Sequence, residues 1–259
     1  MQDVYKKLKN FNLIMGGIHF IQAVAMVFLA TTVIQKISEF QPTIIQFYQQ
    51  FNVETRSLEV VSKELFDLPF GLLVASFLFI SAIAHGFIAL NSKKYEANLR
   101  KGINPYRWYE YALSSSIMIV LIATLFGIYD VVSLLLIFVV NASMNLFGLD
   151  MELLNSGAEK GKINWLPFIW GSIAGIAPWA AILFYMTGTG NLDMVPWFVW
   201  AIIISYFIAF NTFPINMILQ YLKVGKWKDY LYGERVYIIL SLAAKSILAW
   251  LVLFGAMQP

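Results

Sequence analysis

Hydrophobic residues gather along this chain into seven long runs that are separated by short polar stretches. Each run is close to the ~20 residues that a helix needs to cross the hydrocarbon core of a bilayer. Turn-forming residues such as Gly127, Asp130 and Gly157 stand between the runs. The pattern predicts one all-α membrane domain over residues 1–259, a seven-transmembrane-helix bundle. Its helices are expected at about 11–34, 66–91, 105–128, 131–155, 165–187, 196–222 and 234–257.

The polar stretch 35–65, between the first two runs, is too long for a simple connector. Segments 43–51 and 57–61 within it are rich in β-branched and aromatic residues, which is typical of strands. We therefore expect a small β-hairpin in this first external loop. Loops of this length usually have a function or a partner. A lid that covers helix ends and a contact between protomers are both open.

The composition agrees with a membrane protein, because 59% of the residues are hydrophobic and only 13% are charged. Soluble domains carry about 25% charged residues. The chain has no cysteine and only two histidines, which excludes thiolate chemistry and a histidine-rich metal site. A net charge of +3 without a concentrated basic face argues against nucleic-acid binding. No nucleophile–base pair or phosphate loop is visible in the sequence, so we expect no enzymatic activity.

Basic residues alternate between the two sides of the predicted bundle. The side opposite the N-terminus carries only three, Lys36, Arg56 and Lys63, all in the long first loop. Because basic loops stay in the cytoplasm, the N-terminus is expected inside and the C-terminus outside. The basic residues on the N-terminal side are Lys6, Lys7, Lys9, Lys93, Lys94, Arg100, Lys101, Arg107, Lys160, Lys162, Lys223, Lys226, Lys228 and Arg235.

Lys245 lies near the middle of the last apolar run, roughly 15 Å along the helix from Arg235. A lysine at that depth costs about 2.5–3.5 kcal/mol, so it needs a partner or a function. Glu110 lies roughly 9 Å into the third run from the same side of the membrane. Two long side chains can bridge the remaining difference in depth, so we predict a buried Glu110–Lys245 ion pair. A purely structural role for this pair is the alternative.

Other polar residues also fall inside the predicted helices, where each needs a partner. Ser81 and His85 are one turn apart on one face of the second helix. Alternatives remain open for several of these residues. Serines such as Ser116 or Ser143 often bond to their own backbone, His19 can simply pack, and the acidic pair of the fourth helix can be solvated at the interface. The set is His19, Gln22, Ser76, Ser81, His85, Ser114, Ser115, Ser116, Asn141, Ser143, Asn145, Asp150, Glu152, Ser241 and Ser246.

Two short motifs resemble the heliorhodopsin family. One is Arg107-Trp-Tyr-Glu110-Tyr followed by three serines, and the other is Ser241-Leu-Ala-Ala-Lys245 in the last helix. The inverted orientation and the long first external loop resemble the same family, so the resemblance covers the whole chain. It implies a retinal chromophore, all-trans in the dark, bound to Lys245 as a Schiff base. Glu110 would be its sole carboxylate counterion.

The resemblance also implies roles for further residues. Ser241 stands where ion-pumping relatives have a second aspartate, and Ser81, His85 and His19 would form a hydrated cavity that can accept a proton. Arg107, Glu152 and Asn141 would contribute to a polar network. Phe210 takes the place of a usual tryptophan. The implied retinal pocket comprises Tyr111, Ser114, Ser115, Met118, Met144, Gly148, Trp170, Pro178, Phe210, Phe213, Pro214 and Met217.

Pumping relatives carry a second carboxylate on the third helix, about three turns beyond the counterion. Here that position is Leu121, and no titratable side chain occurs from Ser114 to Ile128. We therefore expect a light sensor that transports no ions. It is expected to lie in the lipid bilayer as a homodimer, for which the first external loop is a candidate contact. We also expect it to act on an unidentified cytoplasmic partner. A light-driven ion transporter or channel is the alternative. A retinal-free membrane transporter or regulator is the third hypothesis.

Overall fold

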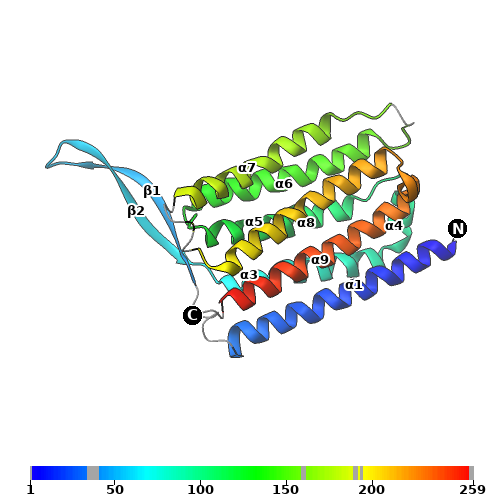
Figure 1. Ribbon diagram of the computed structural model, residues 1–259, viewed down its shortest axis with the longest axis horizontal. Helices are drawn as coiled ribbons and strands as arrows, with labels where there is room; N and C mark the ends of the chain where they lie inside the picture. The colour runs from blue at the N-terminus through cyan, green and yellow to red at the C-terminus, as the bar shows by residue number, and fades with distance from the viewer. Residues whose placement is uncertain (1, 34–40, 159–161, 189–191, 193–194, 257–259) are drawn as a thin grey trace.

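Seven long helices run side by side in the computed structural model, and a hairpin projects from one end of the bundle (Figure 1). The structure describes residues 2–33, 41–158, 162–188, 192 and 195–256. The predicted fold class is confirmed, and the protein is a multi-pass membrane protein. The spanning helices are α1 (Gln2–Phe28), continued by the π-helical turn η1 (Leu29–Val33), α3 (Phe70–Leu90), α5 (Pro105–Leu125), α6 (Val131–Leu154), α7 (Leu166–Gly188), α8 (Trp197–Tyr221) and α9 (Tyr230–Ala256).

Helix boundaries differ most from the sequence expectation at the starts of α1, α3 and α9. Helix α1 begins at Gln2 rather than near residue 11, because Leu8 and Asn12, one turn apart, form a buried face that continues into the apolar run. Helix α9 begins at Tyr230 rather than 234. The expected ends of α1 and α9, at residues 34 and 257, lie outside the described residues. The other helix ends shift by a few residues, as is usual for termini.

Two short helices in the connections were not predicted. Helix α4 (Ser92–Leu99) follows α3, and its buried residues Tyr95 and Leu99 are one turn apart. The 3₁₀ turn η3 (Gly225–Lys228) precedes α9. Both lie at the end of the bundle opposite the hairpin (Figure 1). Helix α4 is thus a small amphipathic element that caps this end.

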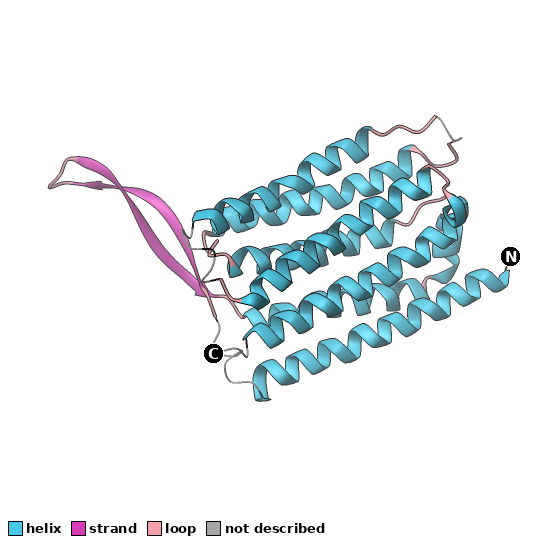
Figure 2. Ribbon diagram, viewed as in Figure 1, coloured by secondary structure: helices cyan, strands magenta, loops and turns pink. Residues whose placement is uncertain are grey.

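The predicted hairpin is present as β1 (Thr43–Asn52) and β2 (Ser57–Asp67), and Figure 2 shows both strands reaching well beyond the helices. The strands pair antiparallel from Thr43↔Asp67 to Asn52↔Ser57. Since β2 continues to Asp67, α3 starts at Phe70 rather than at residue 66. The hairpin is attached at its base, where the Ile45 amide donates to the Tyr129 carbonyl at 3.0 Å.

Capping side chains fix where the two helices in the middle of the fold begin. The Asn104 side chain accepts a hydrogen bond from the Arg107 amide, and Pro105 occupies the first helical position of α5. The Asp130 carboxylate accepts from the Ser133 amide at 2.8 Å and so caps α6. These two starts set the depth at which polar residues of α5 and α6 enter the bundle.

Buried apolar and buried polar residues occupy different halves of the bundle. The half near the hairpin is a large apolar cluster that includes Phe77, Leu121, Ile122 and Val252. On α5, the one buried polar side chain beyond Ser116 is a threonine, whose hydroxyl donates to a carbonyl of its own helix. Buried charged residues lie in the middle of the bundle and toward the opposite end. The candidate site belongs to this polar half.

Candidate functional site

Lys245 and Glu110 form an ion pair at the centre of the bundle. The Lys245 Nζ lies 2.6 Å from Glu110 Oε1, and the two side chains are only 4% and 7% exposed. Lys245 Nζ also donates to Ser241 Oγ at 2.8 Å, and Ser81 Oγ donates to Glu110 Oε1 at 2.6 Å. A buried ion pair is stable only when such additional hydrogen bonds offset the desolvation of both charges. The arrangement joins α3, α5 and α9 at one point.

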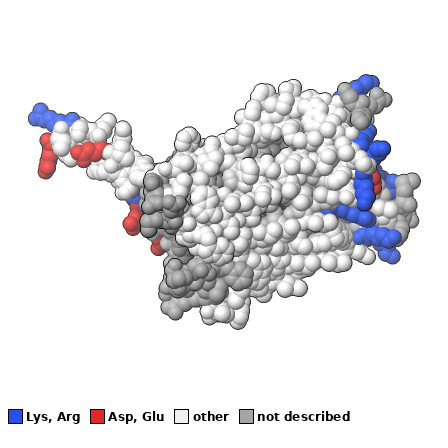
Figure 3. All heavy atoms as spheres, viewed as in Figure 1, with Lys and Arg blue, Asp and Glu red and all other residues white. Residues whose placement is uncertain are grey.

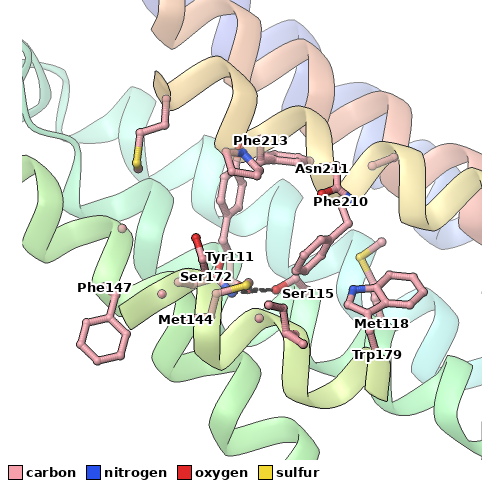
Figure 4. Close-up of a pocket in the computed structure, with 18 of the residues that line it drawn as sticks. Tyr111, Ser115, Met118, Met144, Phe147, Ser172, Trp179, Phe210, Asn211 and Phe213 are labelled. Atoms are coloured by element: carbon pink, nitrogen blue, oxygen red, sulfur yellow. Dashed lines mark hydrogen bonds between the residues drawn. The ribbon is translucent and has the colours of Figure 1, made fainter. Parts of the chain in front are cut away.

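A cavity of about 530 Å³ adjoins Lys245. This volume is within the usual range for a small-molecule site. The cavity wall is mostly apolar and aromatic, and Figure 4 shows Phe210, Phe213 and Trp179 among its lining residues. Lys245 and Ser241 supply polar groups in the wall. The wall is built from α5, α6, α7, α8 and α9. Predicted pocket residues that line it are Tyr111, Ser114, Ser115, Met118, Met144, Gly148, Phe210, Phe213, Pro214, Met217, Ser241 and Lys245.

The prediction for α7 was wrong in its choice of residues. Trp170 is 51% exposed on the outside of the bundle, and Pro178 is buried but does not line the cavity. The stripe that faces the cavity contains Gly171, Gly175 and Trp179, which follow one another at one-turn spacing. Each incorrect choice is the neighbour of a correct one, so it is rotated by about 100° around the helix. The small-residue spacing was the signal that identifies Trp179.

Trp179 closes the cavity together with aromatic residues of α8. Its ring centroid lies 5.7 Å from that of Tyr206 and 5.7 Å from that of Phe210. Trp179 and Phe210 are labelled in Figure 4, and Tyr206 also lines the cavity. Gly175 makes room for this packing, because a Cβ there would lie 2.8 Å from Met144 Sδ. The wall of the cavity is therefore rigid and closely packed on this side.

A second, small cavity of about 30 Å³ lies on the other side of the ion pair. Ser81, His85, Glu110 and Ser241 line it, so the predicted polar cavity brings these four together. Its size gives room for a water molecule. His19 does not line either cavity but stacks on His85, with 5.6 Å between ring centroids. Neither His19 ring nitrogen has a hydrogen-bond partner among the described residues.

Asn141 binds the serines of α5. Its Nδ2 donates to Ser115 Oγ at 2.8 Å and to Ser116 Oγ at 3.0 Å, and Asn145 donates to Ser115 as well. Ser143 instead donates to the carbonyl of Val139 in its own helix, as the alternative for lone serines anticipated. Asn141 therefore ties α6 to the wall of the main cavity and does not touch the ion pair.

Glu152 belongs to a different polar cluster, centred on Arg107. It is 2% exposed, so the alternative of a solvated interfacial carboxylate is wrong for it, whereas Asp150 is exposed. Arg107 Nη2 binds Glu152, and the Trp108 Nε1 and Tyr230 hydroxyl groups donate to it at 2.8 and 3.0 Å. Glu152 and Asn141 were expected in one network of the fourth helix. They bind separate partners because they lie about three turns apart.

Glu234 is the second carboxylate of the Arg107 cluster, and sequence reasoning took it only for the start of a helix. It accepts from Arg107 Nη1, from Asn104 Nδ2 at 2.7 Å and from the Tyr95 hydroxyl at 2.9 Å. Burial and the neighbouring negative charge of Glu234 raise the pKa of Tyr95, so this phenol remains a donor. The one-turn spacing of Tyr95 and Leu99 was the available signal for a buried face.

Seven membrane-length helices around an apolar cavity, with a buried lysine–carboxylate pair in its wall, define a membrane protein of the retinal-protein type. The heliorhodopsin family model matches residues 8–257 of the chain. The chain therefore belongs to the heliorhodopsin family, a family of retinal photoreceptors rather than of enzymes. The predicted resemblance is confirmed. A search of curated proteins gave no match.

The two arginine–carboxylate pairs of the polar end provide a stability test. Arg107→Gln leaves two buried carboxylates without their cation, and we expect a loss of about 3–5 kcal/mol in the free energy of unfolding. Arg100→Gln is the matched control. Arg100, at the C-terminal end of α4, pairs with Glu96 at 2.6 Å, but this pair lies at the surface, so its loss should cost far less stability. Unfolding in mixed detergent micelles measures both variants. Equal destabilisation by the two changes would contradict the assigned role of the Arg107 cluster.

Proposed function

We propose that this protein is a light sensor that binds retinal at Lys245 and converts its photoisomerisation into a conformational signal without pumping ions. Family membership already implies a retinal photoreceptor. One observation carries the assignment of the site: the Lys245 Nζ, 2.6 Å from Glu110 Oε1, lies in the wall of an apolar cavity of about 530 Å³.

The residues around the cavity fit a long apolar polyene with one reactive end. Retinal, when bound as a protonated Schiff base, would supply visible-light absorption and a light-driven change of shape. The lysine amine provides the point of attachment, and Met118, Trp179 and Phe210 provide apolar walls for the chain. Glu110 supplies the negative charge that stabilises a cation at the lysine nitrogen. Its position beside that nitrogen makes it the counterion in this proposal.

Two hydroxyl groups hold the ion pair in one geometry. Ser81 Oγ donates to Glu110 Oε1 at 2.6 Å, and Ser241 Oγ accepts from Lys245 Nζ at 2.8 Å. When the lysine nitrogen moves away from Glu110, its own bond to Ser241 must change, while the Ser81 hydroxyl can keep its bond to the carboxylate. The adjoining cavity beside His85 is the polar region closest to these groups, so we propose it as the region that accepts the proton.

The half of the bundle near the hairpin offers no support for a transport path. Leu121 and Ile122 on α5 are fully buried in an apolar cluster, and the Thr124 hydroxyl is bonded to its own helix. A proton or ion that crosses this region would lose its hydration without gaining partners. In this proposal, the photoisomerisation of retinal therefore changes the positions of the helices and does not move an ion across the membrane. This is the basis for proposing a sensor.

We infer that the end of the bundle opposite the hairpin faces the cytoplasm and carries the signal. Lysine and arginine gather at that end in Figure 3, whereas the hairpin carries both signs of charge. An excess of basic residues marks the cytoplasmic side. In this orientation α1 begins inside, α9 ends outside, and α4 and η3 are accessible to a cytoplasmic partner.

A second copy of the chain is the proposed partner on the outer side. One face of the hairpin presents Phe47, Phe51, Leu58 and Val60, which are between 52% and 69% exposed. An isolated two-stranded hairpin with an apolar face is only marginally stable in water. Covering that face in a homodimer would stabilise it. The hairpin is therefore proposed as part of the dimer contact.

The central test is the visible spectrum after all-trans retinal is added to the purified protein. We expect a retinal-dependent band in the wild type and its complete loss in Lys245→Ala, because the alanine variant has no amine in the cavity. Lys228→Ala, which changes an exposed lysine of η3, is the control and should keep the band. A wild type without a band, or a Lys245→Ala variant that keeps one, would end the proposal.

Glu110→Gln tests the counterion. Removing the negative charge destabilises the positive charge at the lysine nitrogen in the ground state more than in the excited state, so the absorption band should move to longer wavelength. Glu96→Gln, which neutralises a surface carboxylate of α4, is the control. An absorption maximum of Glu110→Gln within error of the wild type would remove Glu110 from this role.

The absence of transport is tested by electrical recording under illumination. We expect no steady photocurrent from wild-type protein in a planar membrane or a patched cell, since the apolar half of α5 lacks partners for an ion. The protein's light-induced absorbance changes, recorded on the same sample, show that it is photoactive. A steady current whose direction follows the orientation of the protein would support the transporter or channel instead.

A further inference from the structure

Asn12 and His85 share a hydrogen bond inside the polar half of the bundle. Asn12 on α1 is fully buried, His85 on α3 is 8% exposed, and 2.8 Å separate Asn12 Oδ1 from His85 Nδ1. A neutral imidazole carries its proton on only one of its two nitrogens, so the direction of this bond decides which nitrogen is the base. The neighbours of Asn12 determine that direction.

The amide nitrogen of Asn12 must face away from His85. It lies 2.9 Å from the Leu8 carbonyl oxygen, which can only accept, so the group at that position has to be the NH₂. The same nitrogen lies 3.4 Å from the Tyr95 hydroxyl, whose proton is already donated to Glu234 at 2.9 Å. The pKa of Tyr95 is raised by burial, so the phenol keeps this proton. Both neighbours are acceptors, and the amide cannot be flipped without losing both bonds.

The oxygen that faces His85 therefore has no proton to give, and His85 Nδ1 must be the donor. We propose that Asn12 is a positioning residue, which holds neutral His85 with its proton on Nδ1 and leaves Nε2 as the only basic nitrogen of the ring. Nothing in the chemistry of a free imidazole fixes this choice, since both neutral forms are accessible. The amide of Asn12 makes it.

The position of His85 makes its protonation form matter. His85 lines the small cavity that also contains Glu110 and Ser81, next to the lysine nitrogen. The ring cannot move freely, because it stacks on His19 and its Cβ packs against α1 at Gly16, where an added Cβ would lie only 2.8 Å away. A proton released in that cavity can then bind His85 only at Nε2. This last consequence rests on the proposed function, whereas the proton position itself does not.

The hydrogen bond can be tested directly by ¹⁵N NMR of protein labelled in histidine. The chain has only two histidines, so His19→Gln assigns the spectrum. We expect His85 in the wild type to show a protonated Nδ1 and an unprotonated Nε2. Asn12→Leu removes the acceptor and should shift the ratio of the two forms by about five- to tenfold, the value of one hydrogen bond.

Asn91→Leu is the matched control. Asn91 also donates its side-chain amide to a carbonyl one turn earlier, at 3.0 Å, but it does not contact His85. It should leave both histidine spectra unchanged. A wild type with the proton on Nε2, or a folded Asn12→Leu variant with an unchanged ratio, would overturn the proposal. If Asn12→Leu does not fold, the wild-type spectrum alone decides between the two proton positions.

A second measurement separates this proposal from the proposed function. In protein that binds retinal, Asn12→Leu should slow the light-induced deprotonation step by at most the five- to tenfold factor by which the ratio shifts, because the rate follows the population of the form of His85 that is protonated on Nδ1. A wild type that binds no retinal overturns the proposed function and leaves the NMR result standing. Retinal binding with an unchanged deprotonation rate in Asn12→Leu, together with a changed proton position, would show that His85 is not the acceptor and overturn the role of Asn12 in that step.

Discussion

The cost of keeping a charged lysine inside an apolar bundle governs the arrangement of its middle. The charge of Lys245 is offset by Glu110. Lys245 also donates a hydrogen bond to the Ser241 hydroxyl, and Glu110 accepts one from the Ser81 hydroxyl. All four side chains must meet within hydrogen-bond distance, so α3, α5 and α9 are fixed relative to one another at this depth. The two cavities of the polar half lie on either side of that junction.

A second set of buried charges lies closer to the end opposite the hairpin, and the two sets are connected. Arg107 joins Glu152 and Glu234 and so ties α5 to α6 and α9. Tyr95 and Asn12 extend this cluster through α4 and α1 as far as His85. This chain of hydrogen bonds ends at His85, which lines the same small cavity as Glu110. Helix α4 takes part in this chain through Tyr95, whose hydroxyl contacts both Asn12 and Glu234.

Depth in the membrane was predictable from the sequence, but the direction of a side chain around its helix often was not. The length of the apolar runs was enough for the fold, and the helical rise was enough to pair Lys245 with Glu110. The assignment of Trp170 and Pro178 to the wall of the cavity did not hold, because the sequence of a uniformly apolar helix such as α7 carries little information on which face is buried. Glu234 and Asn12 were missed for a different reason. Their partners are far away in sequence, and only the packing of α1, α4 and α9 brings them together.

The contrast between the two halves of the bundle argues for a switch rather than a path. On the hairpin side, a displaced charge meets only the apolar cluster around Leu121, where each step would cost desolvation with no compensation. On the other side it meets groups that already exchange hydrogen bonds. The free energy released at Lys245 can therefore be spent only in rearranging bonds toward α4 and the start of α9. A ligand shifts an equilibrium only through interactions that differ between two states, and among the described residues the buried charged groups that could provide such interactions lie in the polar half.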